Sequence, residues 1–321
     1  MTDRAMEHDI YTSPDGKVLP LSTRGAQYKL LESGDAMGGG LLELATVRGP
    51  FQDGYTVTFQ RLGARDLLMT LSRQDCPRED WWDARARLLN LLRPNRLVAG
   101  PYSRPVPGFL RKYMPDGIDY RDLFVEARSI DFNTEPPDQT PGPLQCSVAF
   151  YAADPLWYGP AATALYALRG ISGLRFPAAF EPPVTVAPLP LINVWIFGGE
   201  NWKDTQTLQN MGTWHTYPVI TVTGALDSVA IDNLTTGESV TFNGTIPPGL
   251  VFTIDLTYGQ KRAYDSAGTD YSGYLDGDVG EFHIACDPEA TNGNNVIQVS
   301  IGGGDASTSV QIDFRSPYVG I

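Results

Sequence analysis

The chain has 321 residues, of which 42% are hydrophobic and 19% are charged, and it contains 33 glycines and 25 prolines. This length indicates about two domains, and the glycine and proline content predicts many turns. Acidic residues outnumber basic residues by 37 to 24, and no lysine- or arginine-rich block is present. The composition therefore excludes nucleic-acid binding as the main activity, because affinity for a duplex depends on cation clusters that meet phosphates.

The sequence also predicts neither secretion nor a membrane span. The first nine residues are polar and no apolar segment follows them, so we expect no signal peptide and assembly in a cytoplasm. The run from 184 to 197 is interrupted by two prolines and an asparagine and is too short to cross a bilayer. The three cysteines, far apart and odd in number, predict buried free thiols rather than disulfides or a zinc site: Cys76, Cys146 and Cys286.

The first half of the chain reads as short strands separated by turns. Alternation of apolar and polar residues is the strand signal, because successive side chains leave opposite faces of a sheet. It predicts strands at 10–21 (with a turn at 13–16), 28–32, 41–47, 55–59, 66–71, 109–114, 118–132 and 144–152. The sequence Met114-Pro115-Asp116-Gly117 predicts a hairpin turn between two of them.

One helix is predicted, between Pro77 and Pro94. Proline is tolerated at the start of a helix, and the acidic residues Glu79 and Asp80 suit the first turn. At 3.6 residues per turn, one broad face is apolar, which predicts an amphipathic helix packed over a core. The residues expected in that packing are Trp81, Trp82, Leu88 and Leu92. An exposed anchor formed by the two tryptophans is the less favoured alternative.

Three regions are expected: an N-terminal domain over 1–159, a proline-rich connecting segment over 160–191, and a C-terminal domain over 192–321. In the connecting segment, residues 161–168 fit either a short helix or a strand. Seven alternating segments follow between 217 and 314, each closed by turn residues such as Asn243-Gly244. This rhythm predicts an antiparallel β-sandwich or jelly roll.

No motif for catalysis or cofactor binding stands out. The three histidines, His8, His215 and His283, lack a partner at the spacing of a catalytic triad, and His283 is expected on the face of a strand over 281–284. The sequence contains no phosphate-binding glycine loop and no zinc-protease motif. The segment 276–281 resembles a calcium loop only faintly, and a solvated turn is favoured. We therefore expect no catalytic residue, cofactor or metal.

Aromatic residues in the second half leave two interpretations open. Trp202, Trp214, Tyr258 and Tyr271 either stack on sugars or serve the core or a subunit interface, where tyrosine and tryptophan are enriched.

The order of several short segments resembles the distal tail protein family of long-tailed (siphovirus-like) bacteriophages. In the second half, the matching segments are 210–213, 217–220, 231–233, 249–255, 294–297 and 314–318. In the first half, they are Phe51-Gln52-Asp53-Gly54, the tryptophan-containing helix that ends Leu91-Leu92-Arg93-Pro94, and Pro107-Gly108-Phe109-Leu110-Arg111.

This resemblance implies a mainly β protein with an N-terminal belt domain, a tube-like β-barrel with one helix and a hairpin, and a C-terminal galectin-like sandwich. It also implies a structural, non-enzymatic virion protein that forms a ring, hexameric in the family, at the tail tip. The ring would join the tail tube protein to the hub or fibre proteins, and DNA would pass through its lumen without specific binding. A carbohydrate-binding module in the C-terminal sandwich is the alternative, and a glycan hydrolase is the least favoured reading.

Overall fold

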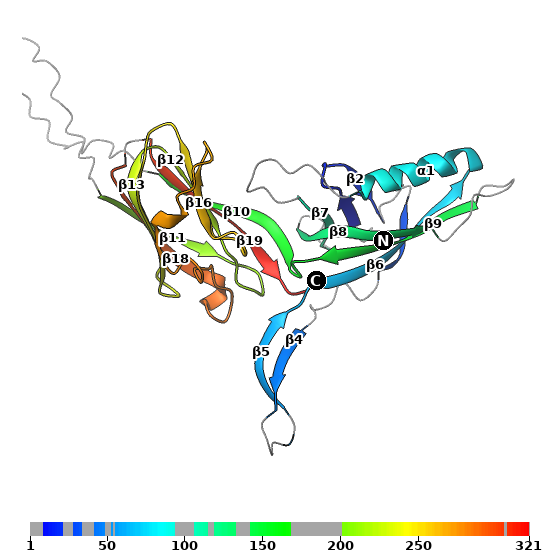
Figure 1. The fold of residues 1–321 in the computed structure, drawn as a ribbon, viewed down its shortest axis with the longest axis horizontal. Helices are drawn as coiled ribbons and strands as arrows, with labels where there is room; N and C mark the ends of the chain where they lie inside the picture. The colour runs from blue at the N-terminus through cyan, green and yellow to red at the C-terminus, as the bar shows by residue number, and fades with distance from the viewer. Residues whose placement is uncertain are drawn as a thin grey trace, which may run out of the picture. The chain divides into compact units, whose positions relative to one another are not determined.

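The structure is a computed structural model that describes residues 9–21, 28–33, 42–48, 53, 55–93, 106–114, 119–132, 142–167, 201–304 and 307–320 (Figure 1). The chain divides into two compact units. Unit 1 comprises Met1–Pro160 and Pro317–Ile321, and unit 2 comprises Ala161–Ser316. The chain therefore passes from unit 1 to unit 2 after Pro160 and returns for its last residues. No helix among the described residues is long and apolar enough to cross a membrane.

Unit 1 consists of strands and one helix. Its elements are β1 (Asp9–Thr12), β2 (Val18–Pro20), β3 (Lys29–Ser33), β4 (Leu42–Val47), β5 (Thr56–Leu62), β6 (Arg65–Cys76), α1 (Arg78–Leu91), β7 (Gly108–Tyr113), β8 (Tyr120–Phe132), β9 (Gly142–Ala152) and the start of β10 (Trp157–Ala167). Each strand lies at or near a segment that alternates in the sequence. The predicted turn at 115–117 and Pro94 lie outside the described residues.

Seven of these strands form an open antiparallel path in the order β2-β1-β7-β8-β9-β6-β3. The long strand β8 joins its two parts, because its first half pairs with β7 and its second half pairs with β9. A bulge between Ala127 and Ser129 interrupts the second pairing, and bulges bend a strand locally. Among the described residues the sheets do not close into a barrel, since β2 and β3 remain the two ends of the path.

Helix α1 lies over this sheet (Figure 1). Pro77 precedes it with an extended backbone, and Glu79 and Asp80 occupy its first turn. Trp81, Ala84 and Leu88 are buried, in one hydrophobic cluster with the inward-facing residues of β6 and β9. The helix is thus held by tertiary packing of one face, as its periodicity predicts.

Unit 2 contains two sheets. The first has the order β11 (Asn201–Gln209), β18 (Asn294–Gly302), β13 (Leu226–Asn233), β14 (Glu238–Ile246) and β17 (Leu275–Gly277). The second contains β16 (Arg262–Asp265), β15 (Val251–Asp255), β12 (Val219–Thr223), β19 (Ser309–Tyr318) and the end of β10. The 3-10 turns η1 (Ser272–Tyr274) and η2 (Thr291–Gly293) complete the unit.

A single buried cluster fills the space between these sheets, with residues such as Val229, Phe242 and Val299 from the first sheet and Ile220, Phe252 and Val310 from the second. The arrangement is sandwich-like, as the alternating segments predict. Residues 161–167, for which the sequence left a helix or a strand open, belong to β10; the remainder of the connecting segment lies outside the described residues.

One predicted strand is wrong. Residues Glu281–Ile284 form a turn with an isolated bridge between Thr216 and Ile284 rather than a strand. The short alternation there comes from a loop whose side chains contact distant parts of unit 2, described below.

Candidate functional site

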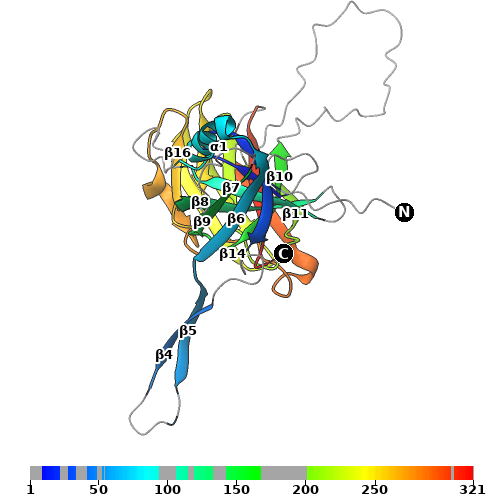
Figure 2. The same ribbon diagram turned by 90° about the vertical axis from the view of Figure 1, so that its right-hand side faces the viewer.

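The most unusual feature of unit 1 is a two-stranded sheet that stands apart from its core. Within the described part of the chain, strands β4 and β5 pair only with each other, in the register Leu42↔Leu62 to Val47↔Thr56. They follow on from the pair β3–β6, because β5 is separated from β6 by Gly63 and Ala64 alone. Figures 1 and 2 show this hairpin extending away from the rest of unit 1.

The hairpin exposes an unusual amount of apolar side chain. Its large apolar residues are between 52% and 67% exposed: Leu42, Leu44, Val47, Tyr55, Val57 and Phe59. None of them belongs to either hydrophobic cluster. Apolar side chains normally gain about 1.5–3 kcal/mol each from full burial, so this segment leaves a large part of that free energy unrealised.

Both faces of the hairpin are apolar. Directly paired residues share a face, so the register places Leu42, Leu44 and Val57 on one face and Val47 and Phe59 on the other. A bulge between Ala45 and Thr46 makes this assignment possible, because it inserts one extra residue into β5 and reverses the alternation there.

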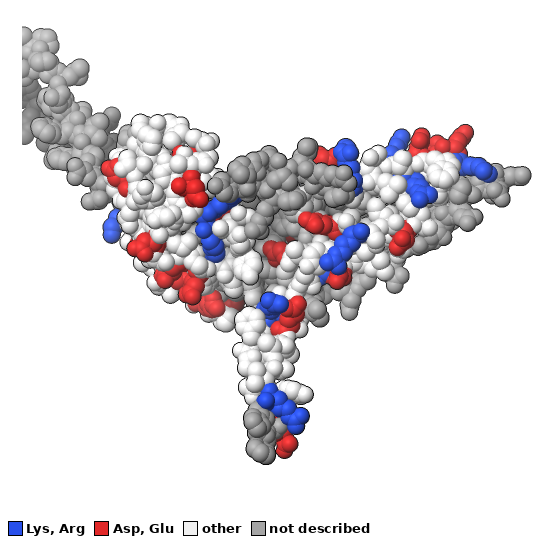
Figure 3. Space-filling model, in the orientation of Figure 1, with Lys and Arg blue, Asp and Glu red and all other residues white. Residues whose placement is uncertain are grey.

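Charges on the hairpin are satisfied internally. Arg61 donates to Glu43 across the two strands with a distance of 2.6 Å between Nε and Oε2, and Arg48 lies over the ring of Tyr55 at 5.9 Å from its centroid. On the face shown in Figure 3, the middle of the hairpin is uncharged and charged side chains lie near its two ends. The hairpin therefore presents a neutral apolar surface.

These observations make the hairpin the candidate contact surface of unit 1. An isolated two-stranded hairpin is only marginally stable in water, and exposed apolar patches of more than a few hundred Å² are rare on monomeric proteins. The segment is expected to gain its stability from a partner that covers it.

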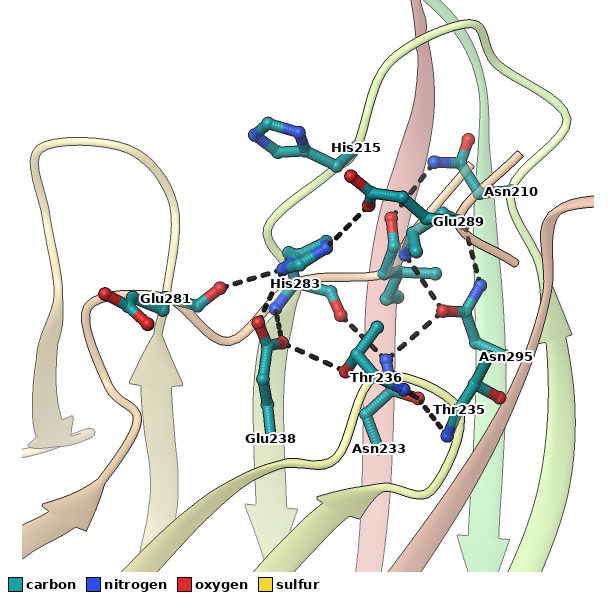
Figure 4. A network of polar contacts seen from close by, with 12 residues as sticks. Asn210, His215, Asn233, Thr235, Thr236, Glu238, Glu281, His283, Glu289 and Asn295 are labelled. Atoms are coloured by element: carbon teal, nitrogen blue, oxygen red, sulfur yellow. Dashed lines mark hydrogen bonds and ion pairs between the residues drawn. The ribbon is translucent and has the colours of Figure 1, made fainter. Parts of the chain in front are cut away.

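Unit 2 contains the densest polar network, which centres on His283 (Figure 4). The Nδ1 atom of His283 lies 2.9 Å from Oε1 of Glu238, and Nε2 lies 3.2 Å from Oε2 of Glu289. The backbone N–H of His283 donates to the other oxygen of Glu238, and its carbonyl oxygen accepts from Asn233. These contacts fasten the loop over 281–289 to the turn between β13 and β14.

Three buried asparagines continue this network. Asn295 donates to the carbonyl oxygens of Ala285 and Gly293, while its own Oδ1 accepts from Ala285 and Asn233. Asn210 donates to the carbonyl oxygens of Trp214 and Ile284. Most of these contacts reach backbone groups of the loop over 281–293, so the network explains how that loop is fixed although it contains no strand.

The histidines do not form a catalytic arrangement in the described residues. The rings of His215 and His283 lie 5.1 Å apart, and Tyr217 contacts His215 through its hydroxyl at 3.3 Å. Burial, assisted by the charge of His283, lowers the pKa of His215. No group of three or more histidine, cysteine or acidic side chains among the described residues is arranged to hold a metal ion. The network therefore offers ion pairs and hydrogen bonds that hold the loop in place.

The residues expected in helix packing do not all lie inside. Trp81, Leu88 and Leu92 are buried, whereas Trp82 is 57% exposed. Adjacent helix positions point about 100° apart, so the sheet under Trp81 cannot also cover Trp82. The exposed ring of Trp82 instead lies edge-on to Trp81 at 4.9 Å and under the guanidinium of Arg85 at 5.8 Å.

The four aromatic residues that were expected to stack on sugars or to serve the core or a subunit interface lie in different environments. Trp202 and Tyr271 are half-buried and pack against the core of unit 2. Trp214 is half-buried with its ring 5.3 Å from His215, and Tyr258 is 85% exposed. Two of the four are thus committed to the core and present no free stacking face.

The hairpin was not among the residues singled out from the sequence. Its strands were predicted, but alternation shows only that a face is apolar and not what covers it. A usable signal was present in the apolar residues of both strands, Leu42 and Leu44 in β4 and Val57 and Phe59 in β5, because two apolar strands without a third strand beside them leave a sheet incomplete.

Comparisons with known proteins agree with the architecture. No known protein family and no curated protein matches the sequence. The solved structure of the Dit protein (gp 19.1) of phage SPP1, described as a paradigm of the hub adsorption apparatus in phages that infect Gram-positive bacteria, matches with a TM-score of 0.59 at 14% identity. The match covers 97% of this chain and 99% of that chain, and it shows that the two share a fold.

Two structures of the phage P2 baseplate in its activated conformation, one with Ca and one with Sr, match with a TM-score of 0.49. Their sequence identities are 9% and 8%, and each match covers 96% of this chain and 98% of the other.

Proposed function

We propose that this chain is a structural protein of a phage tail tip, a distal tail protein that assembles into a ring. The observation that carries the proposal is the match to the SPP1 Dit protein over nearly the whole length of both chains. A match of that extent covers both units, so it supports a similar role for the entire chain and not for one domain alone.

The hairpin supports assembly independently of that match. A subunit that must join others keeps apolar surface exposed until the partner arrives, and closed rings arise when each copy offers two different surfaces to its neighbours. The exposed residues of β4 and β5 fit this requirement.

In this proposal, unit 1 is the belt domain and its open sheet path becomes part of a tube-like wall once copies assemble, while unit 2 is a galectin-like sandwich. The ring, a hexamer in the proposal, joins the tail tube protein to hub or fibre proteins in the virion, after assembly in the host cytoplasm. No enzymatic step is assigned to the chain.

The net charge of -13 suits a channel for DNA. Negative charge repels phosphates and prevents sticking, so DNA passes without specific binding. The prediction for a ring structure is a lumen that is net negative, and a basic lumen would contradict this part of the proposal.

The test is negative-stain electron microscopy of the purified full chain over a range of concentrations. We expect closed annular particles of one size, with a central opening wide enough for a duplex of about 20 Å, since closed rings have a fixed number of copies. A field that contains only single two-unit particles at every concentration would contradict ring formation.

A further inference from the structure

Unit 1 carries a second uncovered apolar surface besides the hairpin, on the outer side of α1. Trp82 is 57% exposed and Leu89 is 43% exposed, and Ala86 between them is also exposed. Positions four and seven residues apart share one side of a helix, so these three residues form a continuous stripe. The stripe combines a tryptophan and a neighbouring arginine, Arg85, which are the residue types that dominate binding energy in protein interfaces.

The hairpin and helix α1 lie on opposite sides of unit 1. In both Figure 1 and Figure 2 the hairpin leaves the unit on the side away from α1. The hairpin of a chain therefore does not cover the α1 stripe of the same chain, and each surface needs a second molecule.

The hairpin face that meets this partner contributes part of an interface between proteins. With roughly 100 Å² of exposed area for each of its three large apolar residues, the face formed by Leu42, Leu44 and Val57 offers on the order of 300 Å², a fraction of the roughly 800 Å² that each partner buries in a stable complex. Its Glu43–Arg61 ion pair is internal, so the surface carries little net charge that would select a charged partner.

We propose that the hairpin face formed by Leu42, Leu44 and Val57 packs against the α1 stripe, Trp82, Ala86 and Leu89, of a second copy of the chain. A copy is the occupant that accounts for both surfaces at once, because each molecule brings one hairpin and one stripe in equal number. This inference rests on the proposed ring and names the surfaces that close it.

The contact is heterologous, since two different surfaces meet. Repetition of such a contact generates a ring when the rotation closes and an open filament when it does not, whereas a contact between two identical surfaces stops at a dimer. The hairpin and helix α1 are two different parts of unit 1, as a head-to-tail contact requires.

The experiment uses paired cysteines in the full chain. Leu44→Cys and Ala86→Cys are introduced together, both at exposed positions, and the protein is oxidised mildly and separated on a denaturing gel without reductant. The natural cysteines Cys76, Cys146 and Cys286 are buried, so they provide a low background. The expected result is a ladder of covalent multimers whose largest member equals the ring. Each single variant should give almost no multimers.

A matched control moves the hairpin cysteine by one residue. Ala45 is exposed and lies on the opposite face of β4, so Ala45→Cys with Ala86→Cys should give a ladder at least about ten-fold weaker. An equal ladder from both pairs would show that the face is assigned wrongly and would overturn the proposal.

Two further outcomes separate this inference from the proposed function. Oligomers in solution without any ladder would refute the hairpin-to-α1 contact and leave the ring intact. Covalent dimers from Leu44→Cys alone would show that hairpins pair with each other and would also refute it. A monomer at every concentration, again without a ladder, would overturn both the contact and the ring.

Discussion

The sandwich of unit 2 and the β4–β5 hairpin of unit 1 are both antiparallel β structure, but they treat apolar side chains in opposite ways. In unit 2, Phe242 is fully buried, with its ring 4.3 Å from Phe252 and 6.1 Å from Tyr271. In the hairpin, Phe59 is 58% exposed and belongs to neither hydrophobic cluster.

The difference lies in what covers the apolar side chains of each element. The strands of unit 2 cover one another across two sheets, and its loops are fixed by buried asparagines. The hairpin has only one partner strand for each of its strands. Unit 2 therefore buries a core between its own two sheets, whereas the hairpin of unit 1 leaves its apolar side chains exposed.

The largest expected effect is the difference in unfolding free energy between a substitution of Phe242 and the same substitution of Phe59. Phe242→Ala should lower the free energy of unfolding of unit 2 by about 3–5 kcal/mol, because it leaves a cavity among packed rings. Phe59→Ala should change the stability of the dilute chain by less than about 0.5 kcal/mol, since its ring is exposed. Denaturant unfolding below the concentration of assembly measures both. Equal losses of stability in the two variants would contradict the contrast between the core of unit 2 and the hairpin.

The next effect concerns the loops of unit 2. Asn295→Ala removes two donated and two accepted hydrogen bonds in a buried site and leaves their partners unsatisfied. We expect a loss of about 2–3 kcal/mol and faster amide hydrogen exchange over 281–295. Gln298→Ala is the control, because the side chain of Gln298 makes only an exposed hydrogen bond to Thr205. We expect this variant to leave both the stability of unit 2 and the hydrogen exchange of the loop unchanged. Unchanged exchange in the Asn295 variant would mean that the loop is held by other contacts.

The smallest effect is a contrast in pH dependence between two carboxyl groups, one in each unit. Burial raises the pKa of Asp154 in unit 1, although Tyr158 donates to it. Backbone hydrogen bonds, from Thr269 above all, lower the pKa of Asp265 in unit 2. The contribution of Asp154 is full below its pKa in the unfolded chain and is lost as pH rises through its raised value. The contribution of Asp265 is full above its pKa in the unfolded chain and is lost as pH falls through its lowered value.

Hydrogen exchange of each unit, followed from pH 3 to pH 7, tests this contrast with Asp154→Asn and Asp265→Asn. The first variant should reduce the loss of unit 1 stability with rising pH, and the second should reduce the loss of unit 2 stability with falling pH. The same sign of change in both variants would contradict the assignment.

Much of the fold follows from alternation. The strands of unit 2 from β12 to β15, together with β18 and β19, lie where apolar and polar residues alternate, because each has one face on a shared core. The helix was likewise predicted from its spacing. Two failures share a cause, which is that a pattern within one segment does not contain its distant neighbours. Trp82 has no sheet beneath it, and residues 281–284 are fixed by Glu238 and Asn233 instead of a neighbouring strand.

The candidate surface was predictable only in part. The hairpin strands were predicted over 41–47 and 55–59, but their isolation was not predicted, because it depends on the course of β3 and β6. The resemblance to distal tail proteins anticipated a hairpin without assigning residues to it. Exposure of each side chain had to come from the structure.

The central claim, that the hairpin is covered by assembly, is tested most directly by the native mass of three versions of the full chain. Leu44 and Leu234 are each 55% exposed, the first in the hairpin and the second in a turn of unit 2. We predict that the unaltered 35.1 kDa chain and Leu234→Asp form the same closed oligomer, and that Leu44→Asp with Phe59→Asp remains monomeric and folded. An oligomer of unchanged mass in the hairpin variant, or its loss in Leu234→Asp alone, would contradict the account.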